Sequence, residues 1–250
     1  MLTGPAKGLT KHFFYPGFTA GSGGLLREPD LLARQAKFNR DAWLQQFGIK
    51  VDGEVDHVRG ERLVSLFCYE PPALDNLLLR LASDPTPTRL LVAPGRPAAA
   101  VRTSLAHFES KKEHFPTWNI DSLLSISYLP WLSQDRFDEL LWACDLNFVR
   151  GEDSLVRAIW AGKPFVWQIY PQNDGAHHAK LNAFLDMMAA PASLRQFSWH
   201  WNAMAGQNDA LPALDLPAWS AAAAALRTRL LMQADLTTQL TEFVNAWSTG

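Results

Sequence analysis

The stretch FVRGEDSLVRAIWAGKPFVWQIYPQ, residues 148–172, contains two apolar segments with an amphipathic segment between them. The outer segments have the continuous apolar character of buried strands, and DSLVRAIWAG between them has the spacing of a helix. Two buried strands joined by a helix form a βαβ unit, whose strands run parallel. The turn before the helix is short, yet it carries Arg150, Glu152, Asp153 and Ser154.

The same alternation of strand and helix patterns precedes this stretch. RLVSLFCY, from Arg62, is an apolar run rich in strand-forming residues, and ALDNLLLRLASD, from Ala73, has leucines at helical spacing. TRLLVAPG and LLSISYL are further predicted strands, each followed by a predicted helix. Repeated units of this kind predict an α/β fold, a doubly wound parallel-sheet, Rossmann-like domain with helices on both faces. We assign residues 62–190 to this domain.

The flanking segments do not repeat the unit. Residues 1–61 are predicted to form an interdomain loop around PGFTAGSGG and one long linker helix, REPDLLARQAKFNRDAWLQQFGI, with Pro29 in its first turn. Residues 191–250 are predicted to form an irregular Ala/Pro segment followed by two helices. The last helix is amphipathic, with Leu236, Leu240, Phe243 and Val244 on one face. Because that face needs a partner, we expect self-association or exposed apolar surface.

Composition excludes several classes of protein. With 48% hydrophobic and 19% charged residues, the 250-residue chain has the composition of a globular protein. Its net charge of -2 provides no broad attraction for nucleic acid or anionic lipid. Only Cys68 and Cys144 are present, and the chain contains no apolar run of membrane-spanning length and no signal peptide pattern. These features predict a cytoplasmic protein that binds neither nucleic acid nor membranes.

The RGEDS turn is the first candidate site, because ligands of open α/β sheets bind beyond the carboxyl ends of the strands. Asp153 is predicted to be the N-cap and Ser154 the first residue of a helix whose free N–H groups can bind phosphate. Arg150 can clamp a phosphate, and Glu152 can accept hydrogen bonds from a sugar diol. Alternatively, both carboxylates only cap the helix, and Arg150 pairs with one of them.

Further motifs carry a family resemblance. A carboxylate at a helix start, followed by AGKP, an apolar strand and YPQNDGAHH, is similar to nucleotide-sugar sites in the C-terminal half of GT-B glycosyltransferases. RGEDSLVRAIWAGKPFVWQIYPQ, VSLFCYE, FFYPGF and GGLLRE together resemble the protein-arginine rhamnosyltransferases of elongation factor P. The resemblance runs from about Lys11 to about Phe184.

The resemblance implies an inverting glycosyltransferase that transfers L-rhamnose from thymidine diphosphate (TDP)-β-L-rhamnose to an arginine of elongation factor P, without a metal ion. It also implies a set of donor-binding residues. They are Arg150, Gly151, Glu152, Asp153 and Ser154 at the nucleotide and pyrophosphate, Phe67 and Tyr69 beside the donor, Trp131 and Gln134 at the base, and, more loosely, Gln172 and Asp174 at the sugar. Among these, Glu152 and Asp153 are the candidate catalytic carboxylates.

Phe67 also fits a place in the core, which burial preferences favour. Ser133 stands where the family usually has a proline before Gln134. His177 matches a family histidine, but together with the neighbouring His178 it lacks the second ligand pair of a metal site.

The family also has a further N-terminal domain, whose Trp-Asp and Asn-Phe-Gly-Asp signatures are absent from this chain. Aspartates of those signatures are expected to activate the acceptor arginine, because a protonated guanidinium is a poor nucleophile. We therefore expect this chain to be the donor-binding half and weak or inactive alone. The alternative is a nucleotide-sugar-binding module without transferase activity. A Rossmann-type epimerase is disfavoured, because VSLFCYEPPALDN has no glycine-rich turn.

Overall fold

The computed structural model of the protein describes residues 2–3, 10–19, 21–49, 60–172, 175–205 and 211–248. The strands are β1 (Leu2–Thr3), β2 (Thr10–Lys11), β3 (Arg62–Leu66), β4 (Thr88–Val92), β5 (Leu124–Tyr128), β6 (Leu146–Arg150) and β7 (Phe165–Gln168). The helices are α1 (Leu31–Ala36), α2 (Arg40–Gln45), α3 (Leu74–Ser83), α4 (Arg96–Ser110), α5 (Gln134–Ala143), α6 (Gly151–Ala161), α7 (Ala176–Met187), α8 (Ala192–Trp201), α9 (Leu216–Leu231) and α10 (Leu236–Ser248).

The central feature is a parallel sheet of five strands in the order β5-β4-β3-β6-β7. The chain adds β4 and β5 on one side of β3, then returns to place β6 and β7 on the other side. The strand order therefore reverses between β3 and β6, where open α/β folds bind ligands. The predicted doubly wound, Rossmann-like fold is confirmed.

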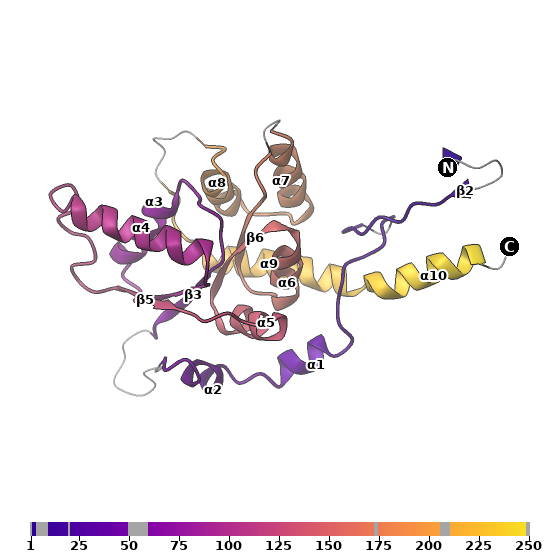
Figure 1. Ribbon diagram of the computed structural model, residues 1–250, viewed down its shortest axis with the longest axis horizontal. Coiled ribbons are helices and arrows are strands. Elements are labelled where there is room, and N and C mark those ends of the chain that lie inside the picture. Colours follow the sequence, from indigo (N-terminus) through magenta and orange to yellow (C-terminus); the bar gives the residue numbers. More distant parts are fainter. Residues whose placement is uncertain are drawn as a thin grey trace.

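Helices cover both faces of the sheet, as strand periodicity requires. Leu63 of β3 and Leu91 of β4 pack with Trp43 of α2 and with α5. Val64 and Leu66 point to the opposite face of β3 and belong to the main core with α3 and α4. Figure 1 shows α3 and α4 on one side of the sheet and α2 on the other. The two faces bury separate apolar clusters.

The predicted long linker helix is wrong. The chain forms two short helices, α1 and α2, separated by Lys37, Phe38 and Asn39. Asn39 is extended, and its side chain accepts a hydrogen bond from the Ala42 N–H, so it caps the start of α2. Phe38 lies edge-on to Trp142 of α5, at 5.5 Å between ring centroids. A capping residue and a buried aromatic contact therefore bend the segment around the sheet.

The segment after residue 190 is more regular than predicted. It contains α8, whose buried residues Leu194, Phe197, Ser198 and Trp201 have the spacing of one helix face. Phe197 and Trp201 pack against Phe148 of β6, with ring centroids 5.9 Å and 4.6 Å away. The Ala/Pro-rich surroundings obscured this helical pattern in the sequence.

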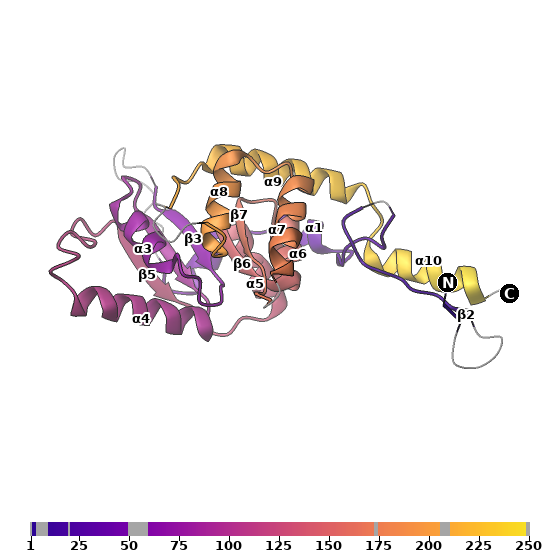
Figure 2. The ribbon, with the colours of Figure 1, turned by 90° about the horizontal axis from the view of Figure 1, so that it is seen from above.

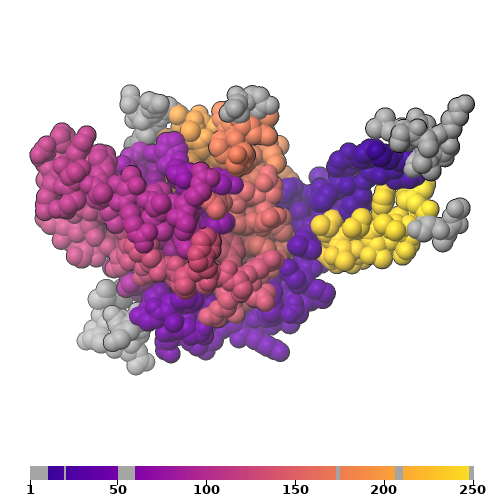
Figure 3. All heavy atoms as spheres, viewed as in Figure 1, coloured from indigo at the N-terminus to yellow at the C-terminus, as the bar shows by residue number. Residues whose placement is uncertain are grey.

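The two ends of the described chain project together from the body of the protein. Figures 1 and 2 show α10 beside the N-terminal segment, and Figure 3 shows the two in contact as an arm. His12 stacks on Trp247 at 3.7 Å between ring centroids, and Phe14 lies 5.3 Å from Phe243. The amphipathic helix thus has a partial partner within the chain. Leu240 is still 43% exposed, so self-association stays a prediction.

None of the helices in the described ranges combines the length and the hydropathy of a membrane span.

Candidate functional site

A cavity of about 710 Å³ opens at the carboxyl ends of β3, β4 and β6, beside the point where the strand order reverses. All the predicted binding residues in the described chain line this cavity except Gln172. They are Phe67, Tyr69, Trp131, Gln134, Arg150, Gly151, Glu152, Asp153 and Ser154. The fold therefore brings together residues from the ends of β3, β5 and β6 and from the starts of α5 and α6.

The start of α6 differs from the prediction that Asp153 is its N-cap. The N-cap is Arg150, which is extended, and the helix begins at Gly151. The Ser154 hydroxyl accepts a hydrogen bond from the Arg150 N–H at 2.9 Å and donates to the Arg150 carbonyl. Glu152 and Asp153 therefore lie in the first turn, where negative side chains interact favourably with the helix dipole.

Gly151 is required at this turn for two reasons. Its φ of +64° lies in the region that glycine adopts without strain. A Cβ at this position would also lie 3.3 Å from the Tyr69 hydroxyl oxygen. The Gly151 carbonyl accepts a hydrogen bond from Trp167 Nε1 at 2.7 Å, which fixes the turn to β7. Tyr69 thus lies close to the N-terminus of α6, where a phosphate can bind.

Arg150 is held without a carboxylate partner. Its Nη1 donates to the Cys68 carbonyl at 3.0 Å, and its guanidinium lies 4.3 Å from the Phe67 ring centroid and 4.7 Å from that of Tyr69. Among the described residues, no ion pair involves Arg150. The alternative in which Arg150 pairs with Glu152 or Asp153 is therefore wrong. Stacking on aromatic rings orients the charge and leaves most of its donors open.

Phe67 and Tyr69 follow β3 and form the aromatic wall of the cavity. Phe67 is half-buried and lies edge-on to Phe137 at 5.3 Å, so its predicted place in the core is wrong. The Tyr69 N–H donates to Gln168 Oε1 at 2.7 Å. A second guanidinium, that of Arg96, lies 5.0 Å from the Tyr69 ring centroid. Backbone and ring contacts thus hold Tyr69 in one orientation.

The two carboxylates of the RGEDS turn are exposed. Glu152 forms an ion pair with Lys180 of α7, at 2.6 Å between Oε1 and Nζ. Its side chain is 59% exposed, so the carboxylate can exchange Lys180 for another partner at small cost. Asp153 is also exposed at the cavity. Their catalytic role stays a prediction.

The segment between β5 and α5 forms another part of the cavity wall. Trp131 is 82% exposed and presents a free ring face. Ser133, where the resemblance predicted a proline, is the N-cap of α5 and accepts a hydrogen bond from the Arg136 N–H. The serine therefore caps the start of this helix. Gln134 is the first residue of α5, and its Nε2 donates to Glu28 Oε1 at 3.3 Å.

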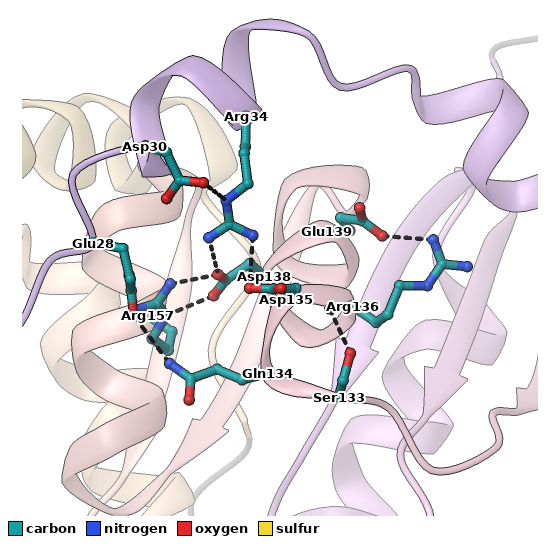
Figure 4. Close-up of polar contacts among 10 residues, drawn as sticks. All are labelled: Glu28, Asp30, Arg34, Ser133, Gln134, Asp135, Arg136, Asp138, Glu139 and Arg157. Carbon is teal, nitrogen blue, oxygen red and sulfur yellow. Dashed lines mark hydrogen bonds and ion pairs between the residues drawn. The ribbon is translucent and has the colours of Figure 1, made fainter.

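Glu28 belongs to an ionic network whose central pair, Arg157 and Asp138, is buried, as shown in Figure 4. Arg157 of α6 donates to both oxygens of Glu28, at 2.8 and 2.6 Å, and its Nε donates to Asp138 of α5 at 2.6 Å. Arg157 is 6% exposed and Asp138 2% exposed. Arg34 of α1 extends the network outward to Asp135 at 2.8 Å. The network joins the segment before α1 to both helices that flank the cavity.

The acids of this network have shifted pKa values. Burial raises the pKa of Glu28, but hydrogen bonding and the charge of Arg157 outweigh it, so the pKa lies below its ordinary value. For Asp138, burial exceeds the same contribution from Arg157, and the pKa lies above its ordinary value. Burial likewise raises the pKa of the Cys68 thiol, below the cavity, to about 12. With 0% of its surface exposed and a raised pKa, the Cys68 thiol has the features of a packing residue.

Between residues 169 and 172, the described residues that follow β7 do not line the cavity. Gln172 is exposed, and its N–H donates to His177 Nδ1 at 3.1 Å. Gln172 does not line the cavity, and its predicted contact with the sugar finds no support in this position. Asp174 lies outside the described residues. His177 is buried and holds the loop through this hydrogen bond.

Several cavity residues escaped the sequence analysis. Ala93 and Pro94 follow β4, and the rule that ligands bind at strand ends would have found them. Arg157 gave a different signal, because it is a charge among the apolar residues of a helix predicted to be buried. Glu28 is not among the lining residues but contacts Gln134 and Arg157, which are. It gave no local signal, because its partner Arg157 is 129 residues away in the chain.

Comparisons with known proteins show which family the chain resembles. A family model described as "Elongation-Factor P (EF-P) rhamnosyltransferase EarP" matches residues 2–245, a wider range than the motifs predicted. The protein-arginine rhamnosyltransferase of Pseudomonas aeruginosa is 42% identical over 257 residues, which cover 97% of this chain and 65% of that protein. Its counterpart from Pseudomonas putida is 48% identical over 178 residues, or 71% of this chain and 46% of that protein.

A solved structure agrees as well. It is described as "Structural basis for EarP-mediated arginine glycosylation of translation elongation factor EF-P" and superposes with a TM-score of 0.73 at 35% identity. The alignment covers 94% of this chain and 76% of the other. The chain thus spans between about half and two thirds of the length of the two Pseudomonas relatives. The family model, the sequence relatives and the shared fold together show that the chain belongs to the elongation factor P rhamnosyltransferase family.

Proposed function

We propose that this chain binds TDP-β-L-rhamnose in the cavity and serves as the donor-binding part of a protein-arginine rhamnosyltransferase. The observation that carries the proposal is Arg150. It is a guanidinium without a carboxylate partner among the described residues, at the N-terminus of α6 and at the wall of a cavity of about 710 Å³. Arg150 is half-buried, and most of its N–H groups have no protein acceptor. Such a cation beside the free N–H groups of a helix start favours a phosphate ligand.

The other residues have complementary roles in the proposal. Arg150 and the first turn of α6 hold the diphosphate, with the Tyr69 hydroxyl as a further donor. Glu152 accepts hydrogen bonds from the sugar of the nucleoside or of the donor, in exchange for Lys180. Trp131 stacks on the base, and Gln134 bonds its edge. No metal ion is included, because Arg150 and the helix N-terminus supply the positive charge.

The proposed reaction is a single displacement with inversion. A nitrogen of the acceptor arginine attacks the anomeric carbon of rhamnose, the bond from this carbon to the diphosphate oxygen breaks, and the guanidinium loses a proton. Negative charge grows on the leaving TDP, and Arg150 with the α6 N-terminus stabilises it. The acceptor in the proposal is an arginine of elongation factor P. The aspartates that take the proton are expected in the part of the relatives outside the match.

Calorimetric titration tests the donor site. We expect TDP-rhamnose to bind, with UDP-glucose as the control that binds more weakly. Absence of binding by both nucleotides would contradict the proposal.

A second assay tests transfer. The chain is incubated with elongation factor P and TDP-rhamnose, and the intact mass of elongation factor P is measured. A mass increase of one rhamnosyl group would support transfer by this chain. Donor binding without any such increase would favour the binding module, or a requirement for the remaining part of the family's length.

A further inference from the structure

The amide of Gln134 has a defined orientation at the cavity wall. Its Nε2 lies 3.3 Å from Glu28 Oε1, and a carboxylate can only accept hydrogen bonds. The nitrogen must therefore face Glu28. Figure 4 shows the amide oxygen of Gln134 on the side away from Glu28. Since Gln134 lines the cavity, this oxygen remains available as an acceptor for a ligand.

Glu28 is itself held in place. Both of its oxygens accept from Arg157, and Arg157 is fixed from the other side by Asp138. Hydrogen bonding to Arg157 also keeps Glu28 ionised at neutral pH, so it has no proton to donate. A reversed amide would place its oxygen against the carboxylate oxygen, which is repulsive. The ionic network therefore sets the orientation of Gln134.

We propose that Glu28 is a positioning residue that makes Gln134 selective for a pyrimidine with a ring N–H, the thymine or uracil type, over cytosine. This inference rests on the proposed function, because it assumes that the nucleotide occupies the cavity. Glu28 acts through Gln134 and does not touch the base.

The chemistry of the two base types explains the preference. Thymine and uracil carry N–H at ring position 3, which can donate to the fixed Gln134 oxygen. Cytosine has a lone pair at this position and offers an N–H only at the neighbouring amino group. A nucleotide whose diphosphate is anchored at α6 cannot slide by a full ring position to recover the bond. Cytosine would then face the Gln134 oxygen with a lone pair.

The test compares TDP with 5-methyl-deoxycytidine diphosphate, which share the sugar, the methyl group and the diphosphate. We expect the wild-type chain to prefer TDP by about tenfold, the ratio typical of one mismatched hydrogen bond. In Glu28→Gln, the new amide can donate as well as accept, so Gln134 can turn. We expect the TDP preference to fall to roughly twofold.

Three further variants sharpen this test. Asp135→Asn alters the outer end of the network at Arg34 and should keep the wild-type ratio. Gln134→Leu should lose the preference without any change in the network. Glu28→Asp keeps the charge toward Arg157 but withdraws the carboxylate from Gln134, and it replaces Glu28→Gln if that variant does not fold.

The outcomes separate this inference from the proposed function. An unchanged ratio in a folded Glu28 variant would overturn the positioning role while TDP binding stands. A wild-type chain that binds TDP and the cytosine analogue equally would also overturn it. Failure of the wild-type chain to bind either nucleotide would overturn the proposed function and this inference with it.

Discussion

Arg150 and Arg157 lie two helical turns apart at the same cavity, yet their surroundings are opposite. Arg157 is 6% exposed and donates to both Asp138 and Glu28. Arg150 donates to one backbone carbonyl and stacks on Phe67 and Tyr69. Both are charged side chains near a helix that flanks a cavity. They differ in whether protein carboxylates already neutralise the charge.

This difference separates a structural arginine from a ligand-binding one. A cation whose donors are all used by buried carboxylates stabilises the fold, and its loss leaves those carboxylates unpaired. A cation with open donors contributes little to folding and can use its charge on an anionic ligand. Substitution of the two arginines should therefore affect different measurements: stability for Arg157, and binding for Arg150.

The largest expected effect is that of Arg157→Met on stability. The substitution leaves Asp138, which is 2% exposed, without its main partner. Loss of one member of a buried ion pair costs about 3 to 5 kcal/mol. Arg34 lies 3.5 Å from Asp138 and should keep the loss near 3 kcal/mol, at the lower end of that range. Urea denaturation followed by circular dichroism measures the free energy of unfolding.

The double variant Arg157→Met with Asp138→Leu is the matched control. Replacing both members of a buried pair by apolar residues is often close to neutral, so most of the stability should return. A single variant as stable as the wild type would show that the network does not hold α5 and α6 together.

The next effect is that of Arg150→Ala on nucleotide binding. A charged hydrogen bond contributes about 1.5 to 3 kcal/mol, so the affinity for TDP should fall by roughly 10- to 150-fold. Calorimetric titration measures this affinity. The free energy of unfolding should stay within about 1 kcal/mol of the wild-type value, because the variant loses a single hydrogen bond. Arg150→Lys keeps the charge and should recover part of the affinity, since it lacks the planar fork. Unchanged TDP affinity in Arg150→Ala would remove Arg150 from the site.

A smaller effect concerns the pH dependence of Glu28. Its pKa is lower in the folded than in the unfolded chain, so its contribution to stability is present above the ordinary value of about 4.3 and is lost as pH falls through the folded value. Wild type should exceed Glu28→Gln in stability at pH 7, and the difference should shrink on acidification. Burial raises the pKa of Asp138 above its ordinary value, but Asp138 is present in both the wild type and the variant. Urea denaturation at several pH values measures the difference in free energy of unfolding between the wild type and Glu28→Gln. A difference that does not change with pH would contradict a lowered pKa for Glu28.

The smallest effect is expected for the ion pair between Lys180 and Glu152, which are 55% and 59% exposed. An exposed pair contributes about 0 to 1 kcal/mol, so Lys180→Ala should change the free energy of unfolding by less than about 1 kcal/mol. Urea denaturation provides the measurement. A loss comparable with that of Arg157→Met would mean that exposure does not govern the contribution of these ion pairs.

Much of the fold follows from local sequence patterns. The βα repeats after Arg62 predicted the doubly wound sheet, because buried strands and amphipathic helices differ in period and length. The prediction of one linker helix was wrong, because the Asn39 cap and the contact of Phe38 with Trp142 interrupt a helical pattern that is continuous in the sequence. The helix α8 was missed, although its buried residues have clear helical spacing. For this segment, the periodicity of apolar residues would have predicted the helix better than its Ala/Pro composition did.

The sequence by itself determined that Arg150 to Ser154 lie together at one strand end and one helix start, because these residues are contiguous, although it placed the N-cap at Asp153 instead of Arg150. Only the tertiary structure decided the rest. Glu28, Gln134 and Arg157 come from three separate segments, and the contact between Glu28 and Arg157 spans 129 residues. Which carboxylate neutralises which arginine depends on the packing of α5 and α6 against the segment before α1. A local sequence pattern does not show which residues far apart in the chain come into contact. Only the folded structure could therefore show that Arg150 has no carboxylate partner among the described residues.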